Sequence, residues 1–246
     1  MAMPGDAAEV RVEGRPVRFV FMNLEEDATR RESFLAEFPG PEWVRFPGCR
    51  GGLMWGEIAR GLGWLGDIRS SYGGQRVRPQ WGTIGCTLSH LFCLRMAAAC
   101  GGIVLFPDDL RNRRGLDLVA AVREIIANRP PGCGWLKLKN AFPRYAPEMQ
   151  AAGGWTFRRL AVADRDDFAD KANLGSAGVI ILREQAQAIL ANLPGITSRG
   201  IDFELRALAD LVPGGCWQVM ETGIEHERPA GVPLGGSTRK RLNGEG

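Results

Sequence analysis

A chain of 246 residues, with 45% hydrophobic and 24% charged residues, has the composition of a soluble globular protein that can bury a substantial core. Its 31 basic and 28 acidic residues give a net charge of +3, which is too balanced to indicate a nucleic-acid partner. The sequence has neither an apolar run of about 18 residues nor a signal-type N-terminal stretch, so no transmembrane segment is predicted and the expected location is cytoplasmic.

Hydrophobic periodicity predicts strands that alternate with helices along most of the chain. Strands are predicted at residues 17–23, 43–46, 103–106, 135–138, 155–160, 177–182 and 217–221. Helices are predicted at residues 28–38, 83–99, 116–128, 184–191 and 202–211, with a further one around 56–65. This alternation favours an α/β fold with a central, mostly parallel sheet flanked by helices.

One domain is expected over residues 17–228, after a flexible N-terminus at 1–16 and before a mobile, basic tail at 229–246. The tail contains Arg239-Lys240-Arg241, three charges that would give only a weak peripheral attraction to an anionic membrane.

A glycine-rich stretch at residues 47–80 is long enough to be a functional loop. Four aromatic residues lie in or beside it: Trp55, Trp64, Tyr72 and Trp81. Either they stack on sugar rings, as part of an acceptor site or lid, or they anchor the core.

The six cysteines form no C-x-x-C pair, so neither a zinc ribbon nor a thioredoxin-like motif is predicted. Cys86, Cys93 and Cys100 recur every seven residues. We expect them to be small buried thiols along one face of a helix.

Asp108 and Asp109 follow a predicted strand directly after Pro107. In open α/β sheets, ligands bind beyond the carboxyl ends of the strands. Two carboxylates there suit a hard divalent cation whose coordination shell is completed by phosphate oxygens. A turn with an aspartate cap on the next helix gives the same pattern, so both interpretations stay open on these residues alone.

Residues 82–90, GTIGCTLSH, resemble the G-E-I-G-C-x-L-S-H motif of glycosyltransferase family 25, which includes lipooligosaccharide and collagen galactosyltransferases. Further segments resemble motifs of that family in the same order. They are Met22-Asn23-Leu24 with Arg30-Arg31 (I-N-L-D-R-R-x-D-R), residues 104–109 (V-L-I-L-E-D-D), residues 175–181 (G-T-x-A-Y-L-I) and Ile201-Asp202 (V-D). The similar segments together span residues 17–211.

The resemblance implies a GT-A-type fold that binds a nucleotide sugar, with a UDP-sugar such as UDP-galactose as donor. It also implies a divalent cation such as Mn²⁺ at Asp108 and Asp109, which would bridge the donor diphosphate and stabilise the departing UDP. In this family the first strand and helix border the nucleotide, so Asn23, Arg30 and Arg31 are candidate donor-binding residues beside Asp108. For the two arginines, a solvated helix face is the alternative.

Two positions depart from the family's pattern. Pro107 stands in place of the first acid of E-D-D and offers no carboxylate. The site is then expected to bind metal through Asp109 alone, with Asp108 near the ribose, to bind it weakly, or not to bind it. Glu25-Glu26 replaces the Asp-Arg pair of the opening segment. Either change is compatible with altered donor choice or with loss of activity.

Ser89 and His90 end the L-S-H motif and are candidate substrate-site residues, although a lone histidine on an amphipathic helix is more often a structural residue. Three arginines follow the acidic pair: Arg111, Arg113 and Arg114. We expect them to solvate a loop, with phosphate binding as the alternative.

A transfer that inverts the anomeric carbon needs a general base to deprotonate the acceptor hydroxyl. Asp202 matches the family's V-D position and is the first candidate for this role, with Glu204 as the second. An N-cap of the following helix is the alternative for Asp202.

The sequence therefore predicts a hexosyltransferase that moves a galactose-like sugar from a UDP-sugar to a glycan, glycolipid or hydroxylated acceptor, with metal assistance and inversion. A catalytically silent relative that binds a nucleotide sugar or glycan is the alternative, and Pro107 favours it. A nucleotidyltransferase that releases pyrophosphate is a weaker alternative.

Overall fold

The computed structural model describes residues 9–50, 81–139, 148–160, 177–193 and 201–226. Its strands are β1 (Arg11–Val12), β2 (Arg15–Asn23), β3 (Trp43–Pro47), β4 (Gly102–Pro107), β5 (Leu110–Asn112), β6 (Trp135–Lys137), β7 (Met149–Ala152), β8 (Trp155–Arg159), β9 (Val179–Leu182), β10 (Cys216–Val219) and β11 (Ile224–His226). Its helices are α1 (Ala28–Glu37), α3 (Trp81–Ala99), α4 (Leu118–Asn128), α5 (Arg183–Asn192) and α6 (Ile201–Leu208).

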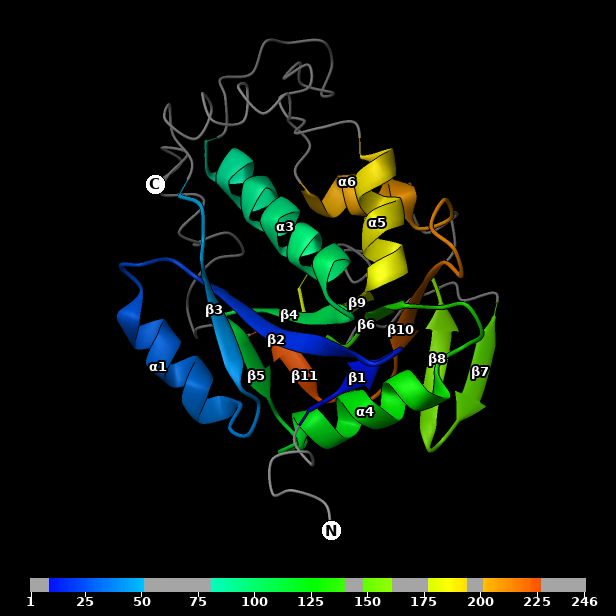
Figure 1. The fold of residues 1–246 in the computed structure, drawn as a ribbon. Coiled ribbons are helices and arrows are strands. Elements are labelled where there is room, and N and C mark those ends of the chain that lie inside the picture. Colours follow the sequence, from blue (N-terminus) through cyan, green and yellow to red (C-terminus); the bar gives the residue numbers. More distant parts are fainter. Residues whose placement is uncertain (1–8, 51–80, 140–147, 161–176, 194–200, 227–246) are drawn as a thin grey trace.

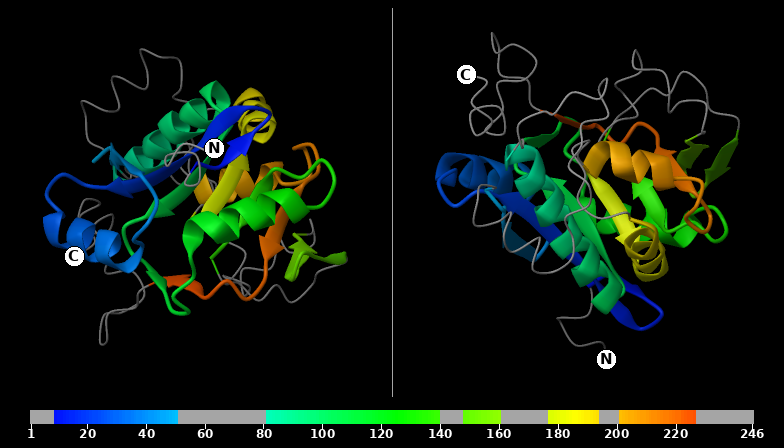
Figure 2. Two further views of the ribbon diagram at one scale, coloured as in Figure 1. Left: turned by 60° about the horizontal axis from the view of Figure 1, so that its bottom comes forward. Right: turned by 90° about the horizontal axis from the view of Figure 1, so that it is seen from above.

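The described elements form three layers, with a nine-stranded sheet between two groups of helices (Figure 1). Helices α3, α5 and α6 cover one face of the sheet, and α1 and α4 lie against the other. The turned views in Figure 2 show the same separation of the two helix groups. The fold is therefore a layered α/β domain, as the alternating strands and helices predicted.

Strand order in the large sheet is β1-β2-β4-β9-β6-β10-β8-β7. Strand β3 pairs with the same edge of β2 as β1 does, but with a later part of β2. The pairs β2–β3, β2–β4 and β6–β10 are parallel, and β9 runs antiparallel to both β4 and β6. The sheet is consequently mixed, and the expectation of a mostly parallel sheet holds only in part. Since β9 is antiparallel to both of its neighbours, β4 and β6 run in the same direction. The strands that end at the same edge of the sheet are therefore β2, β3, β4, β6 and β10. We call this edge the carboxyl edge.

Strand β4 shows why the sheet needs helices on both faces. Ile103 and Leu105 pack in the core beneath α3, α5 and α6, whereas Val104 and Phe106 pack in the core with α1 and α4. All four side chains are almost fully buried. Since successive side chains of a strand point to opposite faces, a continuous apolar run is expected where both faces are covered.

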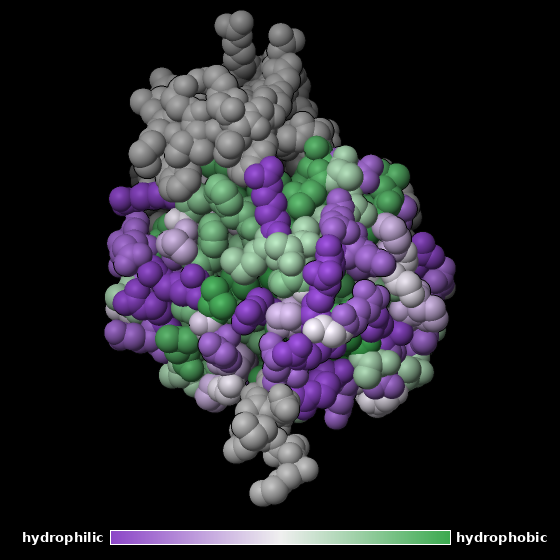
Figure 3. Space-filling view, viewed as in Figure 1, coloured by the Kyte–Doolittle hydropathy of each residue, from purple (hydrophilic) through white to green (hydrophobic). Residues whose placement is uncertain are grey.

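Helix α3 returns to the sheet through a close turn at Gly101. The backbone N–H of Gly101 donates to the Pro16 carbonyl at 2.9 Å. A Cβ at residue 101 would lie 2.5 Å from the Arg15 carbonyl oxygen, so only glycine fits there without a shift of the backbone. On the face shown in Figure 3, apolar side chains gather over α3. The ionisable side chains of this helix, apart from its thiols, are Arg95 and His90.

Short polar strands account for most of the differences from the predicted elements. Residues 9–16, expected to be part of a flexible N-terminus, instead include β1 and the start of β2, with Val10 buried in the core. The turn between these strands has positive φ at Glu13 (52°) and Gly14 (73°), which allows a tight hairpin. Strands β5, β7 and β11 were not predicted either, and β5 pairs with β11 in a separate two-stranded sheet.

The thiols along α3 agree only in part with the expectation of buried thiols, because Cys93 is buried whereas Cys86 and Cys100 are half-buried. All six cysteines are free, and Cys86, Cys93 and Cys100 pack on the core between α3 and the sheet. Within the residues described, no helix is long and apolar enough to cross a membrane.

Candidate functional site

The first group of predicted site residues lies where β2 and β4 end at the carboxyl edge. The backbone N–H of Asp108 donates to the Met22 carbonyl at 3.2 Å, which extends the parallel pairing of the two strands past Pro107. Asn23 Nδ2 then donates to Asp108 Oδ2 at 2.7 Å and to the Asp27 carbonyl at 2.9 Å. Two residues predicted separately, 85 positions apart, are therefore in direct contact.

Two arginines border this pair, one from a helix and one from a strand. Arg30, in the first turn of α1, places Nη1 3.5 Å from Asp108 Oδ1 and 4.0 Å from Asp27 Oδ2. Arg45, on β3, donates from Nε to Asn23 Oδ1 at 3.3 Å and from Nη2 to Glu25 Oε2 at 2.8 Å. Asn23 is thus held through both ends of its amide group.

Burial governs the ionisation of Asp108, which is 7% exposed. Desolvation raises the pKa of its carboxyl, and the charges of Asp109 and Asp27 add to this effect. The hydrogen bond from Asn23 and the charge of Arg30 act in the opposite direction, but the net direction is upward.

Arg31 lies next to Arg30 on α1 and is half-buried. Its charge helps to lower the pKa of Glu25, after the larger contributions of Arg45.

Ser89 and His90 lie in the middle of α3, and their side chains have different surroundings. The hydroxyl of Ser89 accepts from the Cys49 backbone N–H at 2.8 Å and donates to the Gly85 carbonyl at 2.9 Å. Ser89 therefore fixes the segment that follows β3 against α3. Because the Gly48 N–H donates to the Asn23 carbonyl at 3.1 Å, the same segment also joins α3 to the first group of residues.

His90 is 4% exposed and shares its environment with Asp202 at the start of α6. Its Nδ1 lies 2.8 Å from the Cys86 carbonyl, while Nε2 makes no hydrogen bond within the described part of the chain. Burial lowers the pKa of His90, but Cys86 and the carboxylate of Asp202 outweigh it, and the net direction is upward. Asp202 is half-buried, and the side chain of Glu204 lies outside the described residues.

The predicted site residues therefore form two groups on opposite faces of the sheet. Asn23, Arg30 and Asp108 lie on the side of α1, and His90 and Asp202 lie between α3 and α6. The segment at residues 48–49 links the two groups along the carboxyl edge. One group of predicted site residues therefore lies on each side of this edge.

The donor set at Asp108 and Asp109 does not fit a cation held by both aspartates. Asp108 already binds Asn23 and Arg30 through its two oxygens, and Pro107 has no carboxylate. Across the ranges that the structure describes, no group of three or more His, Cys, Asp or Glu side chains could hold a metal ion. Metal binding through the half-buried Asp109 alone stays a prediction.

The three arginines after the acidic pair serve the local structure around β5. Arg111 is buried and donates to the Leu110 carbonyl at 2.8 Å. The Arg113 N–H donates to the Gly223 carbonyl at 2.9 Å, and Arg114 Nη1 donates to the Glu221 carbonyl at 2.6 Å. The expectation that all three solvate a loop is wrong for Arg111, which is buried, whereas Arg113 and Arg114 are exposed.

Sequence reasoning missed several polar residues of the carboxyl edge. Arg45 and Glu25 belong to the network around Asn23, and Lys137 and Gln218 are buried side by side at the ends of β6 and β10. Gln218 Nε2 donates to the Lys137 and Lys139 carbonyls at 3.1 and 2.8 Å. A charged residue inside a short apolar strand was the available signal for Arg45 and Lys137.

Some predicted residues lie outside the described ranges. They are the glycine-rich loop with Trp55, Trp64 and Tyr72, the side chain of Trp81, and the basic tail with Arg239-Lys240-Arg241.

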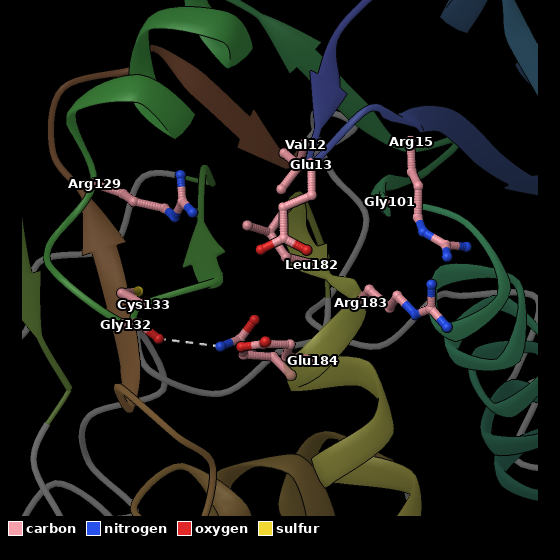
Figure 4. A pocket seen from close by; sticks show the side chains of 11 residues that line it. Val12, Glu13, Arg15, Gly101, Arg129, Gly132, Cys133, Leu182, Arg183 and Glu184 are labelled. Atoms are coloured by element: carbon pink, nitrogen blue, oxygen red, sulfur yellow. Dashed lines mark hydrogen bonds between the residues drawn. The ribbon is translucent and has the colours of Figure 1, made fainter.

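A small pocket of about 60 Å³ lies at the opposite edge of the sheet (Figure 4). Its walls come from the β1–β2 hairpin, the turn before β4, the segment after α4 and the start of α5. The charged residues in its lining are of both signs: Arg15, Arg129, Arg183, Glu13 and Glu184. It contains none of the predicted site residues, so it is separate from the chemistry of the carboxyl edge.

The chain was compared with known proteins. No protein-family model matches it, and no curated protein is significantly similar to it. Its resemblance to glycosyltransferase family 25 therefore rests on the motifs alone.

Proposed function

We propose that this chain is a glycosyltransferase of the GT-A type, which moves a hexose such as galactose from a UDP-sugar to a glycan, glycolipid or other hydroxylated acceptor. The observation that carries this proposal is the contact between Asn23 and Asp108 at 2.7 Å. Each residue belongs to a different family-25-like motif, and their contact lies at the sheet edge where α/β domains bind ligands.

The two groups of residues suit the two substrates. The donor would lie beside Asn23, Arg30 and Asp108, where the first strand and helix border the nucleotide in the family that the chain resembles. The acceptor would lie on the side of His90 and Asp202. A hexose at the carboxyl edge then lies between both groups.

Asp202 would act as the general base in an inverting displacement. The acceptor oxygen attacks the anomeric carbon, the bond from that carbon to the β-phosphate oxygen breaks, and the hydroxyl proton passes to the Asp202 carboxylate. Buried His90, whose pKa is raised in part by Asp202, would help to position this carboxylate. UDP leaves with the negative charge on its β-phosphate.

The family that the chain resembles supplies Mn²⁺ to stabilise this charge. Asp109 is the remaining candidate ligand, because Asp108 is engaged by Asn23 and Arg30. We therefore assign no step of the reaction to a bound cation.

A catalytically silent nucleotide-sugar or glycan binding protein is the second candidate. Pro107, in place of an acid, is the observation that favours it. Such a protein would keep the donor region and lose turnover.

Release of UDP from UDP-galactose, UDP-glucose and UDP-N-acetylglucosamine tests the proposal, with water and simple glycosides as acceptors. We expect release with one donor and a decrease of about 100-fold or more in Asp202→Asn, since general-base catalysis contributes about that factor. The matched control is Asp117→Asn, an exposed helix cap that accepts from the Ala120 N–H at 3.0 Å and should keep normal activity.

Thermal shift separates the candidates further. Stabilisation by UDP without turnover of any donor would support the silent relative. If UDP does not stabilise the chain and no donor is turned over, both candidates are excluded. Pyrophosphate release from a nucleoside triphosphate would favour a nucleotidyltransferase.

A further inference from the structure

We infer that Arg30 and Arg45, rather than a cation held by two aspartates, neutralise the donor diphosphate, so that UDP binds without a divalent metal. The inference rests on the proposed function and concerns how the donor region of that site meets the charge of its ligand.

Asp108 connects the end of β4 to β2 and α1 through its side chain, so its oxygens are not freely available to a metal ion. Its Oδ2 accepts from Asn23 at 2.7 Å and its Oδ1 lies 3.5 Å from Arg30 Nη1. A cation bound at Oδ2 would compete with the amide of Asn23, which is itself only 2% exposed. Breaking a buried hydrogen bond to a charged group is unfavourable, and this cost opposes metal binding at Asp108.

The two guanidinium groups, in contrast, are accessible. The side chain of Arg30 is 40% exposed and that of Arg45 is 26% exposed. A guanidinium has five N–H donors, and the hydrogen bonds of Arg45 with described residues use only its Nε and one Nη2 donor. Arginine forks match the geometry of phosphate oxygens, so both groups can bind a diphosphate while they stay anchored to the Asn23–Asp108 pair.

Glu25 forms an exposed ion pair with Arg45. Its Oε2 lies 2.8 Å from Arg45 Nη2, and its side chain is 76% exposed. The single carboxylate oxygen bound to the guanidinium in this way takes the place that one phosphate oxygen would take. Because an exposed ion pair contributes little stability, an incoming diphosphate can displace Glu25 at small cost.

The other charges at this edge do not change the assignment. Glu26 pairs with Arg50 at 3.0 Å on the outside, and Asp27 lies 4.0 Å from Arg30. Asp109 and Arg31 add one charge of each sign. Among the described residues, Arg30 and Arg45 are the two cations that touch the central Asn23–Asp108 pair, so they are the ones positioned to receive the diphosphate.

Calorimetric titration of the full chain with UDP, in EDTA and again in Mn²⁺, tests the inference. We expect binding in EDTA, with an affinity that changes less than about threefold on adding Mn²⁺. Arg45→Ala and Arg30→Ala should each weaken UDP binding about tenfold or more, since each loses a charge-assisted hydrogen bond. Arg11→Ala is the matched control, because Arg11 forms a similar exposed pair with Glu9 at 2.6 Å away from the carboxyl edge.

Two further variants guard against simple loss of folding. Arg45→Lys keeps the charge but not the fork, and should bind UDP with an intermediate affinity. Glu25→Gln removes the competing carboxylate from an exposed position and should tighten UDP binding about two- to fivefold.

Binding that occurs only with Mn²⁺, is lost in Asp109→Asn and is unaffected by Arg45→Ala would overturn the inference and leave the proposed function standing. If the unaltered chain binds UDP in neither buffer, the proposed donor is wrong and the inference falls with it.

Discussion

The side-chain amide of Asn23 bridges Asp108, the Asp27 carbonyl and Arg45 at the end of β2. Asn23 and its partner Asp108 are both buried, and each is bonded through both polar atoms of its side chain. Asn23 therefore sets the spacing between β2, β3 and β4 at the point where a ligand would bind.

Replacing Asn23 with alanine would leave the buried Asp108 carboxylate without its 2.7 Å donor. We expect the free energy of unfolding to fall by about 2–3 kcal/mol, as for other hydrogen bonds to buried charged groups. Urea denaturation with and without the substitution measures this difference.

The matched control for Asn23→Ala is Asn192→Ala. The amide of Asn192 donates to the Ala188 carbonyl at an exposed helix end, so its loss should cost less than about 0.5 kcal/mol. Equal effects of the two substitutions would contradict the bridging role of Asn23.

His90 makes stability depend on pH. Its folded-state pKa lies above the usual 6.5 because Cys86 and Asp202 outweigh the effect of burial. A raised histidine pKa means that the folded state holds the proton more tightly than the unfolded state. This contribution is complete below the unfolded pKa and is lost as the pH rises through the folded pKa.

We therefore expect the free energy of unfolding to decrease as the pH rises above the ordinary histidine pKa of about 6.5, and the decrease to be smaller in His90→Asn. Thermal melts of both proteins over this range measure it. Since His226 is present in both, its titration cancels in the comparison. A pH profile that is the same in the two proteins would rule out a raised pKa at His90.

At the scale of elements, α1 is held by an aromatic cluster beneath the donor region. Phe34 is fully buried, with ring centroids 5.0 Å from Phe21 and Phe38 and 4.9 Å from Trp43. Through this cluster, α1 is fixed on β2 and β3, and Arg30 is carried on its first turn. The position of a surface cation thus depends on the packing of a core residue one turn away.

Phe34→Ala is expected to lower the free energy of unfolding by about 3–5 kcal/mol, as for other buried phenylalanines. The adjacent Leu35 is 41% exposed, and Leu35→Ala should lower it by less than about 1 kcal/mol. Guanidinium denaturation followed by tryptophan fluorescence compares them. Similar losses for both variants would show that α1 is not anchored through Phe34.

The sequence predicts long apolar elements better than short polar ones, for a physical reason. The runs that become β2, β4 and β9 are apolar because both faces of the sheet are covered, and this pattern is local. In contrast, β5 and β11 are three residues each and are stabilised by one another across more than a hundred positions. No local pattern reports such a pairing.

The candidate site follows the same rule. Asn23, Arg30 and Asp108 were predicted from motifs, but their contacts depend on the parallel pairing of β2 with β4, which spacing does not specify. Arg45 was missed because β3 reads as an ordinary short strand, and its role appears only when β3 pairs beside Asn23. Conversely, Ser89 was expected to bind a ligand, and its described hydrogen bonds hold the backbone at residues 49 and 85.

At the scale of the whole molecule, the sheet separates the candidate donor and acceptor regions. Asn23 and Asp108 lie with α1 on one side, and His90 and Asp202 lie with α3 and α6 on the other. The residues between them, Gly48 and Cys49, contact both sides through backbone hydrogen bonds.

Variants in the two regions should then act independently. We expect Asn23→Ala to weaken UDP binding about tenfold and His90→Asn to change it less than about threefold, because only the first lies in the proposed diphosphate region. The losses of unfolding free energy should add within about 0.5 kcal/mol in the double variant, as for sites with no shared partner. Transfer to an acceptor, measured as UDP release, should fall in both single variants. A strong coupling in unfolding free energy would instead mean that the segment at residues 48–49 transmits changes between the faces, and that the two regions form one continuous site.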